Sequence, residues 1–476
     1  MPQIAIVGAG IAGLNAALTL QDAGLSSSIY EASSHIGGRM HSDATTWGGE
    51  MVAELCGEFI DGDDEVLHGL MKRFGLKAVN LEHKGIRRRQ NITYLSNHYR
   101  SAEEIGEALE SIAPILRQQA AEAPFPTTYD SYTETAYRLD HLSVSEWIER
   151  YVPGGHQALA GHLLDTVCTG FYGLGTKEQS ALNLVYMFAP SVSEGSSGPS
   201  GPLQGALKIV GGNQLLPLAI AGSLPQERIC LQHQLVAVRR SHDETITLSF
   251  TTPRGPLDVI CDHAILALPF STLRHVDYSQ AGFDALKQTA ITQLGYGTIS
   301  KLFLQFDTRY WDHDGPWPGP HSGLIITDLA LQVLWDGSLG QAGPGGLLVD
   351  YRGGAFGAAY SPPMPYTTTR DSELIQHYAQ RCLEQAERIF PGIRSHYTGT
   401  AALSYPTGDP YLRGSYSCWG VGQYTRFAGY ERVRQGPIHF AGEHCSLEYQ
   451  GFMEGAAREG ARAAREVLQD FAPNQN

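Results

Sequence analysis

A glycine-rich motif near the start of the chain places the strongest constraint on its fold. Residues 8–13 read Gly-Ala-Gly-Ile-Ala-Gly, which matches the pattern G-x-G-x-x-G. A short apolar run at 4–7 is typical of a buried parallel strand, and residues 14–23 are rich in helix formers. Glu31 ends the next expected strand, about 20 residues further on. This order of strand, turn, helix, strand and acid predicts a dinucleotide-binding βαβ unit.

Each part of the motif has a physical task in holding a dinucleotide. Gly8 permits the tight turn, Gly10 lets a pyrophosphate approach the backbone, and Gly13 lets the helix pack closely on the strand. The N-terminus of the helix offers free N–H groups and the positive end of its dipole to the phosphates. Glu31 is expected to accept hydrogen bonds from ribose hydroxyls.

Beyond this unit the sequence pattern turns helical and then strand-like. Helices are expected at 102–119, 143–151 and 372–389 and within 165–187, and strands at 237–240, 245–251, 264–268, 299–306 and 346–351. Residues 193–205 are rich in Ser, Gly and Pro and predict an exposed loop. The end repeats the logic of the start, with a strand at 438–440, a turn at 441–443 and a helix at 454–469. Helical insertions between two halves of a βαβ-type fold predict interleaved domains.

The overall composition is that of an ordinary globular protein with an acidic balance. The 476 residues are 42% hydrophobic and 17% charged, and the formal net charge is −15. Nucleic acid is not expected as a partner, because phosphate binding needs a basic surface. There is no run of 18 apolar residues and no visible signal peptide, so we expect no membrane span and a cytoplasmic location, with a removed export signal left open. The seven cysteines are scattered without metal-ligand spacing, which predicts reduced thiols and no metal site.

The segment that follows the second strand narrows the cofactor to FAD. Residues 31–39 read Glu-Ala-Ser-Ser-His-Ile-Gly-Gly-Arg, where the glycine pair allows a second close backbone approach and Arg39 is able to pair with a phosphate. This arrangement resembles the flavin-containing amine oxidase family, which includes monoamine oxidases, polyamine oxidases and L-amino acid oxidases. Further matches to that family follow in order at 53–62, 211–217, 235–238, 264–269, 413–417, 440–443 and 451–455.

The resemblance implies an α/β fold in which a Rossmann-like FAD-binding domain is interleaved with an α+β substrate domain. The FAD-binding domain is expected to take residues 1–80, 205–275 and 395–476. The substrate domain is expected to take 81–204 and 276–394, with its 100–190 part mostly helical. The implied cofactor-binding residues are Gly8, Gly10, Ile11, Ala12, Gly13, Glu31, Ala32, Gly38, Arg39, Cys56, Gly57, Glu58, Val236, Gly442, Glu443, Gly451, Phe452 and Met453. Among them, Glu443 is expected to hold ribitol hydroxyls, and Met453 to head a helix that points at the flavin.

The same resemblance implies a small set of catalytic side chains. The family's lysine, held beside flavin N5 through a water, falls at Lys301, and a lysine inside an apolar strand is costly unless it is paired or functional. The cysteine that binds FAD covalently in some monoamine oxidases corresponds here to Tyr416, so we expect FAD to be held without a covalent bond. Two tyrosines stack over the amine in those enzymes. The second falls at Phe452 and the first is lost at Ser417, and Trp419 is expected to take over part of the cage.

The resemblance constrains the substrate less tightly than the cofactor. Plant-type polyamine oxidases carry a carboxylate that captures a cationic tail, and it corresponds here to Asp61, with Glu58, Asp63 and Asp64 close by. We therefore expect Asp61 and Glu58 to act at the substrate site. Venom-type L-amino acid oxidases hold the substrate carboxylate with an arginine in this segment, but residues 58–71 contain none. The other candidates for that role are Arg352, Arg87, Arg88 and Arg89.

The implied activity is that of an FAD-dependent oxidase that takes a hydride equivalent from the carbon bearing the amine. Hydrolysis of the imine releases ammonia, and transfer of the electrons to molecular oxygen gives hydrogen peroxide. An L-amino acid, above all a basic one, is the preferred substrate, and a polyamine or simple amine is the alternative. A desaturase, an isomerase or a non-catalytic FAD-binding protein on the same fold is more distant. The sequence leaves a homodimer open, and His439 and His444 are expected to be structural.

Overall fold

A parallel sheet forms the base of the dinucleotide-binding part of the molecule. The computed structural model describes residues 2–81, 91–193, 206–318 and 324–471. In that part of the chain the strands of this sheet lie in the order β21 (Ile438–Phe440), β13 (His263–Leu266), β1 (Ile4–Val7), β2 (Ser27–Tyr30) and β9 (Ile229–Cys230). Each neighbouring pair is parallel. This is the Rossmann-like α/β unit that the glycine motif predicts.

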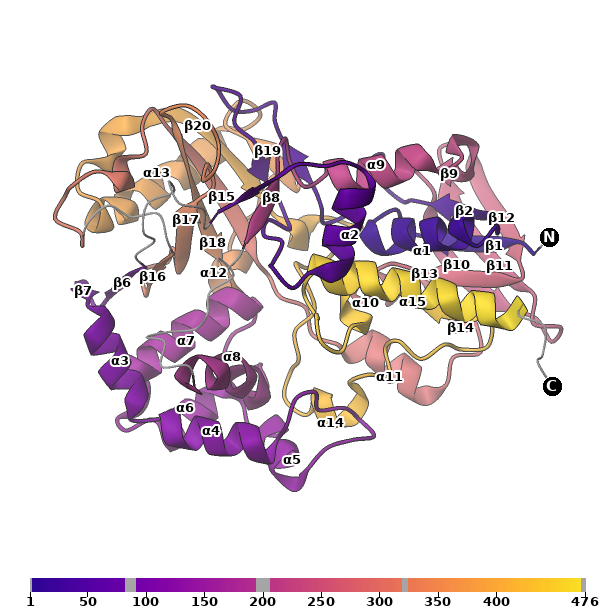
Figure 1. Cartoon of the computed structure of the whole chain (residues 1–476), viewed down its shortest axis with the longest axis horizontal. Coiled ribbons are helices and arrows are strands. Elements are labelled where there is room, and N and C mark those ends of the chain that lie inside the picture. Colours follow the sequence, from indigo (N-terminus) through magenta and orange to yellow (C-terminus); the bar gives the residue numbers. More distant parts are fainter. Residues whose placement is uncertain (1, 82–90, 194–205, 319–323, 472–476) are drawn as a thin grey trace.

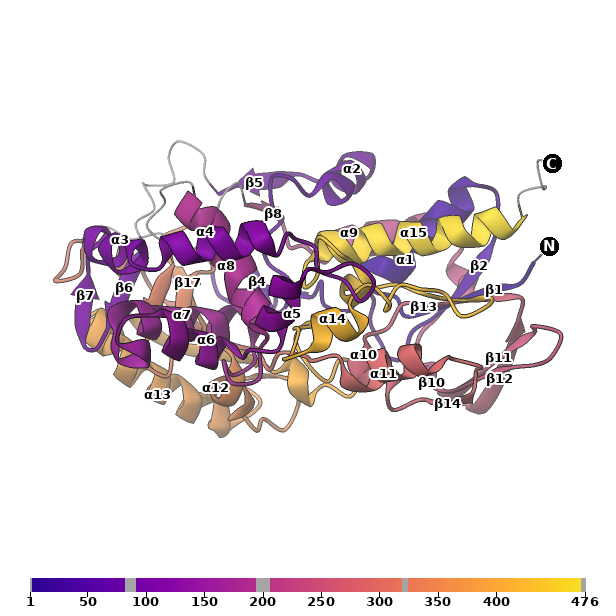
Figure 2. The same ribbon diagram turned by 90° about the horizontal axis from the view of Figure 1, so that it is seen from below.

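Two helices from opposite ends of the chain pack against each other on this sheet. They are α1 (Ile11–Asp22) and α15 (Met453–Phe471), which run side by side in Figures 1 and 2. A Cβ atom at Gly460 would lie 2.0 Å from the carbonyl oxygen of Ala12, so the two backbones approach closely only because position 460 is glycine. The side-chain amide of Asn15 donates to the Ala457 carbonyl at 2.8 Å and fixes the register of this contact.

A larger mixed sheet forms the second part of the molecule. Its described strands lie in the order β19 (Tyr366–Thr368), β20 (Tyr397–Ser404), β15 (Ser300–Phe306), β18 (Gly346–Arg352), β17 (Val333–Asp336), β16 (Ile325–Thr327), β6 (Ile92–Leu95) and β7 (His98–Arg100). The central strand β15 is buried along its whole length. Helix α13 (Glu373–Ile389) packs on this sheet with an apolar face that includes Ile375, Leu383 and Ile389.

Three small sheets complete the strand inventory of the described residues. The larger of them has the order β12 (Gly255–Cys261), β11 (Ile246–Thr252), β10 (Gln234–Arg240) and β14 (Asp277–Gln280). The others pair β3 (Ser42–Asp43) with β4 (Ala53–Glu54), and β5 (Ala78–Asn80) with β8 (Leu207–Ile209). The last two pairs carry the chain from the parallel sheet towards the mixed sheet.

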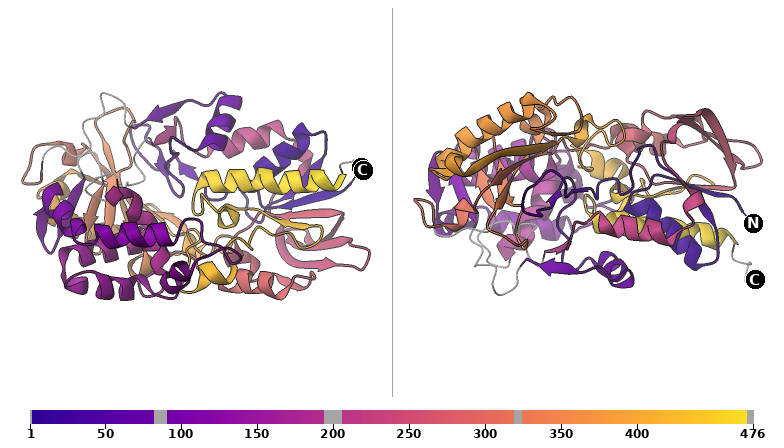
Figure 3. Two further views of the ribbon diagram at one scale, coloured as in Figure 1. Left: turned by 60° about the horizontal axis from the view of Figure 1, so that its bottom comes forward. Right: turned by 90° about the horizontal axis from the view of Figure 1, so that it is seen from above.

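A group of helices lies beside the mixed sheet and is seen at the lower left of Figure 1. It comprises α3 (Ala102–Glu110), α4 (Ala113–Glu122), α5 (Glu134–Asp140), α6 (Val144–Tyr151), α7 (Leu159–Tyr172) and α8 (Ala181–Ser193). The remaining helices are α2 (Glu65–Arg73), α9 (Leu215–Ser223), α10 (Phe270–Leu273), α11 (Ala285–Gln293), α12 (Gly354–Ala358) and α14 (Gln423–Phe427). Figure 3 shows the helical group at one end of the molecule and the parallel sheet at the other.

Two of the expected helices are split in the structure. The helix expected at 102–119 is wrong as one element, because Ser111 and Ile112 interrupt it and a new helix, α4, begins at Ala113 with Pro114 in its first turn. The segment 165–187 contains two helices, since α7 ends at Gly173, whose φ of +75° is the left-handed conformation of a C-terminal cap. The strands at 237–240, 245–251, 299–306 and 346–351 are confirmed to within a few residues. The expected loop at 193–205 lies almost entirely outside the described residues.

The structure also bears on the expectations about membranes and thiols. No helix in the described ranges is long and apolar enough to cross a membrane. All seven cysteines are free, and five of them are buried. The thiols of this chain therefore contribute to packing rather than to cross-linking.

Candidate functional site

A cavity of about 950 Å³ opens at the carboxyl ends of β1 and β2 and continues to side chains of β15, β17 and β18. This edge of a parallel sheet is where open α/β folds bind their ligands. The expected site residues that line the cavity are Gly8, Gly10, Ile11, Ala12, Glu31, Ala32, Gly38, Arg39, Cys56, Gly57, Glu58, Asp61, Lys301, Trp419, Gly442, Glu443, Gly451, Phe452 and Met453. Gly13 and Val236 are not among the lining residues. In the strand β10, the cavity is lined instead by Gln234 and Leu235.

The turn between β1 and α1 has the shape of a phosphate cradle. Gly8 has a φ of +106°, and a Cβ atom there would lie 2.6 Å from the Ala267 carbonyl oxygen. A Cβ at Gly13 would lie 2.0 Å from the Gly8 carbonyl oxygen, which explains why Gly13 packs behind the turn instead of lining the cavity. A Cβ at Gly10 would meet no protein atom within 4 Å, so the surface is open there.

The N-terminus of α1 is free to bind an anion. It has no side-chain cap and no acidic residue in its first turn. The first N–H groups of the helix and its dipole therefore face the cavity without a competing carboxylate. Together with the open surface at Gly10, this arrangement fits the pyrophosphate of a dinucleotide such as FAD.

Glu31 is held in position at the end of β2. Its Oε2 accepts a hydrogen bond from the Ala9 N–H at 2.7 Å, and its Oε1 accepts one from the Ser33 N–H at 2.8 Å. Each carboxylate oxygen has a further acceptor site, because an ionised carboxylate offers about four lone-pair positions. The geometry fits the expected role of Glu31 as an acceptor for ribose hydroxyls.

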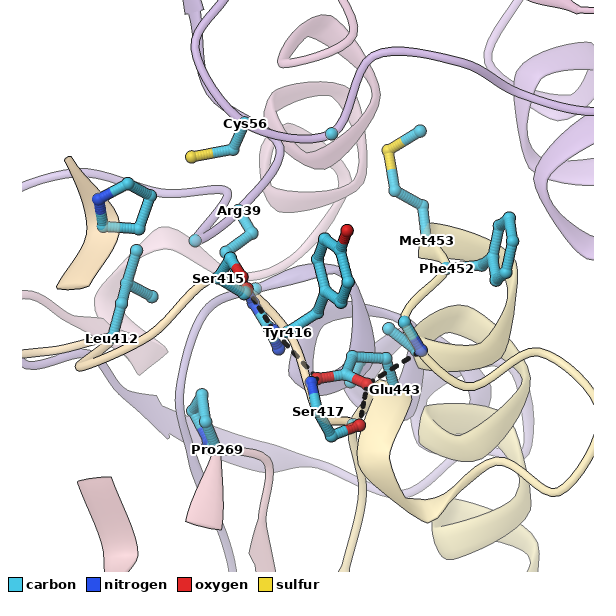
Figure 4. Close-up of a pocket in the computed structure, with 18 of the residues that line it drawn as sticks. Arg39, Cys56, Pro269, Leu412, Ser415, Tyr416, Ser417, Glu443, Phe452 and Met453 are labelled. Atoms are coloured by element: carbon cyan, nitrogen blue, oxygen red, sulfur yellow. Dashed lines mark hydrogen bonds and ion pairs between the residues drawn. The ribbon is translucent and has the colours of Figure 1, made fainter. Parts of the chain in front are cut away.

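Glu443 ties three segments of the cavity wall together, as Figure 4 shows. Its Oε1 accepts from Arg39 Nη1 at 2.9 Å and from the Ser417 N–H at 3.1 Å. Its Oε2 accepts from the Ser417 hydroxyl at 2.6 Å and from the Gly451 N–H at 2.9 Å. Burial by itself raises the pKa of Glu443, but the charge of Arg39, the neighbouring His444 and the hydrogen bonds from Ser417 and Arg39 together lower it. Glu443 thus organises the wall, and its binding of ribitol hydroxyls stays a prediction.

Lys301 points into a buried charge cluster beside the cavity. Its Nζ donates to the carbonyls of Glu54 and Cys56 at 3.0 and 2.7 Å and contacts Glu58 Oε2 at 2.9 Å. Lys301 is only 5% exposed, so it is not a lysine at a strand edge that reaches solvent. Burying a charged lysine inside an apolar strand is costly unless it is paired and hydrogen-bonded, and Lys301 meets both conditions.

A second lysine, Lys208, completes this cluster. Its Nζ lies 2.5 Å from Glu58 Oε1, and the Trp335 indole N–H donates to the same oxygen at 3.0 Å. Burial by itself raises the pKa of Glu58, but Lys208 and Lys301 together bring it below its usual range. Two ammonium groups thus face the Glu58 carboxylate, and the buried Glu54, whose pKa burial raises to about 7, lies close enough to interact with Lys208 and Glu58. Glu58 is fully engaged, so it has no free oxygen for a cationic substrate.

Sequence reasoning did not single out Lys208, Trp335 or Tyr351. Lys208 stands in the apolar run Ala-Leu-Lys-Ile at 206–209, which is the same signal that singled out Lys301. Trp335 and Tyr351 carry no local signal, because only the pairing of β15, β17 and β18 brings their side chains to the cavity.

Aromatic side chains surround the inner part of the cavity. The hydroxyls of Tyr351 and Tyr416 are 2.9 Å apart, and Tyr416 also donates to the Phe171 carbonyl. Figure 4 shows the Tyr416 ring standing between Arg39 and Met453. Trp419 is 6% exposed and packs on Tyr424 with ring centroids 5.0 Å apart, so it is held mainly by the core.

Phe452 and Met453 close the cavity at the start of α15. Phe452 is 47% exposed and stands beside Met453 in Figure 4. A Cβ at Gly57 would lie 2.7 Å from the Met453 sulfur, so the glycine allows Met453 to pack against this segment. His439 and His444 do not line the cavity. Burial lowers the pKa of His444 to about 3, which keeps it neutral.

Asp61 lines the cavity, and no basic side chain of the described residues pairs with its carboxylate. Its Oδ1 is buried and accepts no hydrogen bond from the described residues. Burial, reinforced by the charge of Asp63, raises the pKa of Asp61 to about 6. Asp64 lies just behind it, and its Oδ2 accepts a hydrogen bond from the Asp61 N–H at 2.9 Å. Asp61 is therefore ionised at neutral pH without a counter-ion from this part of the chain.

The basic side chains that line the cavity lie elsewhere. Arg39 is paired with Glu443, and Lys301 with Glu58. Arg413 is exposed and lies near His275. The pKa of His275 is lowered mainly by burial and further by the charge of Arg413. Arg352 does not line the cavity, because it pairs with the buried Asp350. The other arginines that the sequence offered, at 87–89, lie outside the described residues.

We expect Glu31→Ala to weaken FAD binding, because the ribose hydroxyls lose a charge-assisted acceptor worth about 1.5–3 kcal/mol. That corresponds to a dissociation constant roughly 10- to 150-fold higher. Fluorescence titration of the apoprotein with FAD measures it. Glu227→Ala, at an exposed glutamate in the loop before β9, is the matched control and should bind like the wild type. Equal affinities would show that Glu31 does not contact the ribose.

We expect Glu58→Ala to lower the free energy of unfolding by about 3–5 kcal/mol, because it leaves two buried ammonium groups without a carboxylate. Denaturant unfolding of the holoprotein measures this. Since the folded-state pKa of Glu58 is lowered, its stabilisation is present at neutral pH and fades as the pH falls below about 4.3 towards that lowered value. The exposed Glu149, paired with His156, is the control, and its removal should change little. A small effect at Glu58 would mean that the two lysines find other partners.

Comparison with known proteins agrees with this geometry. The family model for flavin-containing amine oxidoreductases matches residues 11–468. An L-amino-acid oxidase of Siganus canaliculatus is 25% identical over 99% of this chain and 86% of its own length, and a putrescine oxidase of Kocuria rosea is 24% identical over 98% and 95%. The structure of cyclohexylamine oxidase from Brevibacterium oxydans superimposes with a TM-score of 0.82 at 19% identity, covering 99% of this chain and all of that one. The chain whose cradle, carboxylates and buried lysine form this cavity therefore belongs to the flavin-containing amine oxidoreductase family and uses FAD as its cofactor.

Proposed function

We propose that this chain is an oxidase for a primary amine that carries a second positive charge, with a diamine as the first candidate. The observation that carries this proposal is the unpartnered carboxylate of Asp61 on the cavity wall. A carboxylate that is ionised and half-buried without a counter-ion is stabilised by a cation that enters the cavity. Among the residues that the structure describes, no basic group offsets its charge, since the causes of its raised pKa are burial and Asp63.

The described residues divide the work of the reaction between two walls. Bound FAD supplies the hydride acceptor and the route for electrons to oxygen. Asp61 holds the distal cation, which orients the substrate so that its reacting carbon faces the flavin side of the cavity. Tyr351, Tyr416 and Phe452 surround the chain of the substrate and exclude water from it. The ammonium groups of Lys301 and Lys208 stabilise negative charge that develops beside them.

A basic L-amino acid is the second candidate. The similarity to an L-amino-acid oxidase favours it, and its side-chain cation suits Asp61 equally well. Its carboxylate needs a cationic partner, and the described arginines of the cavity are engaged away from Asp61. This candidate therefore depends on Arg87, Arg88 or Arg89 reaching the substrate. Because a diamine needs no such partner, we place it first.

A peroxide-coupled screen separates the two candidates. It compares putrescine, cadaverine and spermidine with the L-amino acids and with simple monoamines, each at the same concentration in air. Activity on diamines above that on arginine and lysine supports the proposal, and the reverse order supports the amino acid. Turnover of monoamines alone would show that the substrate needs no second positive charge and would contradict the proposal. Flavin that no amine reduces would point to another reaction on this fold.

We expect Lys301→Met to slow reoxidation by oxygen on the order of 10-fold or more, because the nearly isosteric side chain removes a buried cation that attracts electrons towards oxygen. Anaerobic bleaching of the flavin by substrate should stay near the wild-type rate. Stopped-flow absorbance measures both half-reactions. Lys287→Met is the matched control, since Lys287 is equally buried but donates to the carbonyls of Tyr430 and Glu431 away from the cavity. An unchanged oxygen rate would make Lys301 structural.

We expect Asp61→Asn to lower kcat/KM for putrescine by roughly 30-fold or more, since losing one partner of a desolvated charge pair costs about 2–5 kcal/mol. Butylamine, which has the same chain length without the second charge, is the internal control and should be affected little. In the wild type, kcat/KM for the diamine should also fall as the pH drops through about 6, because Asp61 becomes protonated. The Asp61→Asn variant should not show this decrease near pH 6. Equal losses for both amines would place Asp61 outside the substrate site.

A further inference from the structure

Two histidines meet under the last turns of α15, at the end of the parallel sheet away from the cavity. In the register of β13 and β21, His439 lies opposite Ile265. Because alternate residues of a strand share a face, His263, two residues before Ile265, lies on the same face as His439. The two imidazole centroids are 5.7 Å apart. The fold thus brings together two side chains that are 176 residues apart in the sequence.

The helix α15 adds two carboxylates to this face. Glu466 and Asp470 are one helical turn apart, so both point at the strands. Glu466 Oε2 lies 2.9 Å from His439 Nδ1, and Asp470 Oδ2 lies 3.8 Å from His263 Nδ1. Arg434 Nη1 donates to both oxygens of Asp470, at 2.8 and 2.6 Å, and holds the carboxylate next to the histidines.

Each imidazole has a buried ring nitrogen without a hydrogen-bond partner among the described residues. These atoms are His439 Nε2 and His263 Nδ1. His439 is completely buried, and its Nδ1 is committed to Glu466. A proton on Nδ1 leaves a lone pair on Nε2, and a buried lone pair without a donor is costly. A carboxylate that fixes the tautomer of a histidine in this way is the usual hydrogen-bond partner of a metal-binding imidazole.

We propose that His263, His439 and Asp470 bind a divalent transition-metal ion of the Zn²⁺ class, with Glu466 as the residue that orients His439. The three ligand atoms already lie within 4.8 Å of one another. In a tetrahedral zinc site such atoms are about 3.3 Å apart, so a modest closure completes the site. Two imidazoles and one carboxylate suit Zn²⁺, Co²⁺ or Ni²⁺ better than Mg²⁺ or Ca²⁺, and water takes the open position.

This ion has a structural task that is separate from the oxidation of an amine. Asp470 belongs to the last turn of α15, and Met453, the first residue of the same helix, lines the cavity. Figure 2 shows α15 running alongside α1 towards the end of the molecule where the C-terminus lies. An ion held by two strands and the end of this helix fixes α15 on the sheet. The seven cysteines contribute nothing to the site, which is why no metal-ligand spacing marks it in the sequence.

The test uses the FAD-loaded full chain, treated with EDTA and then dialysed into chelator-free buffer. Isothermal titration with ZnCl₂ should show one tight site, and saturation should raise Tm by about 2 °C or more. Asp470→Asn should weaken Zn²⁺ binding at least 10-fold, and Glu466→Gln should weaken it about 10- to 100-fold. MgCl₂ at the same concentration should leave Tm unchanged.

Asp22→Asn is the matched control for Asp470→Asn. Asp22 is also a half-exposed aspartate whose two oxygens pair with an arginine, Arg73, but it has no histidine beside it. It should bind Zn²⁺ like the wild type. The proposal is overturned if Zn²⁺ gives neither heat nor a Tm shift up to millimolar concentration. It is equally overturned if Asp470→Asn and Asp22→Asn bind Zn²⁺ with the same affinity as the wild type, since the ion then sits elsewhere. Asp470 is partly exposed, so its variant is expected to fold even where a variant of His439 does not.

Discussion

The carboxylate of Glu58 is the point at which the parts of this molecule are joined. Lys208 reaches it from β8, Lys301 from β15 and Trp335 from β17, while Glu58 itself belongs to the segment that follows β4. Removing these groups from water costs several kcal/mol for each ion, and the cost is met only because every charge has close partners. The segment next to the flavin site is therefore locked to the mixed sheet by one buried ion cluster.

The same cluster sets the electrostatics of the cavity. At one wall the Glu58 carboxylate is paired with two ammonium groups, and at another Asp61 has no counter-ion among the described residues. Buried charges act strongly on one another, because the effective dielectric constant inside a protein is lower than in water. This charge pattern is the basis for proposing a substrate with two cationic groups, one of which would pair with Asp61.

The helix α15 connects the cavity to the opposite end of the parallel sheet. Its close contact with α1 depends on Gly460, and its first residue, Met453, packs against Gly57. Its last turn meets His263 and His439 through Asp470 and Glu466. A helix that is fixed at both ends and along its length is a rigid support for the residues at its start. The cluster of histidines lies away from the cavity, but through its contacts with the last turn of α15 it helps to hold this helix on the sheet.

The sequence by itself determined the cofactor cradle, because its signals are local. The glycines at 8, 10 and 13, the helix that follows and Glu31 are fixed by turn geometry and helix electrostatics within one βαβ unit. Lys301 was also visible, since a charge inside an apolar strand has to be paired. Only the tertiary structure decided which groups it pairs with. Lys208, Glu58 and Trp335 come from separate elements. Only the packing of those elements shows that Glu58 is the carboxylate paired with the lysines and that Asp61 has no basic partner in the described part of the chain. The physical reason is that charge pairing depends on distance in space, and spacing along the chain carries that information only within a single helix, strand or turn.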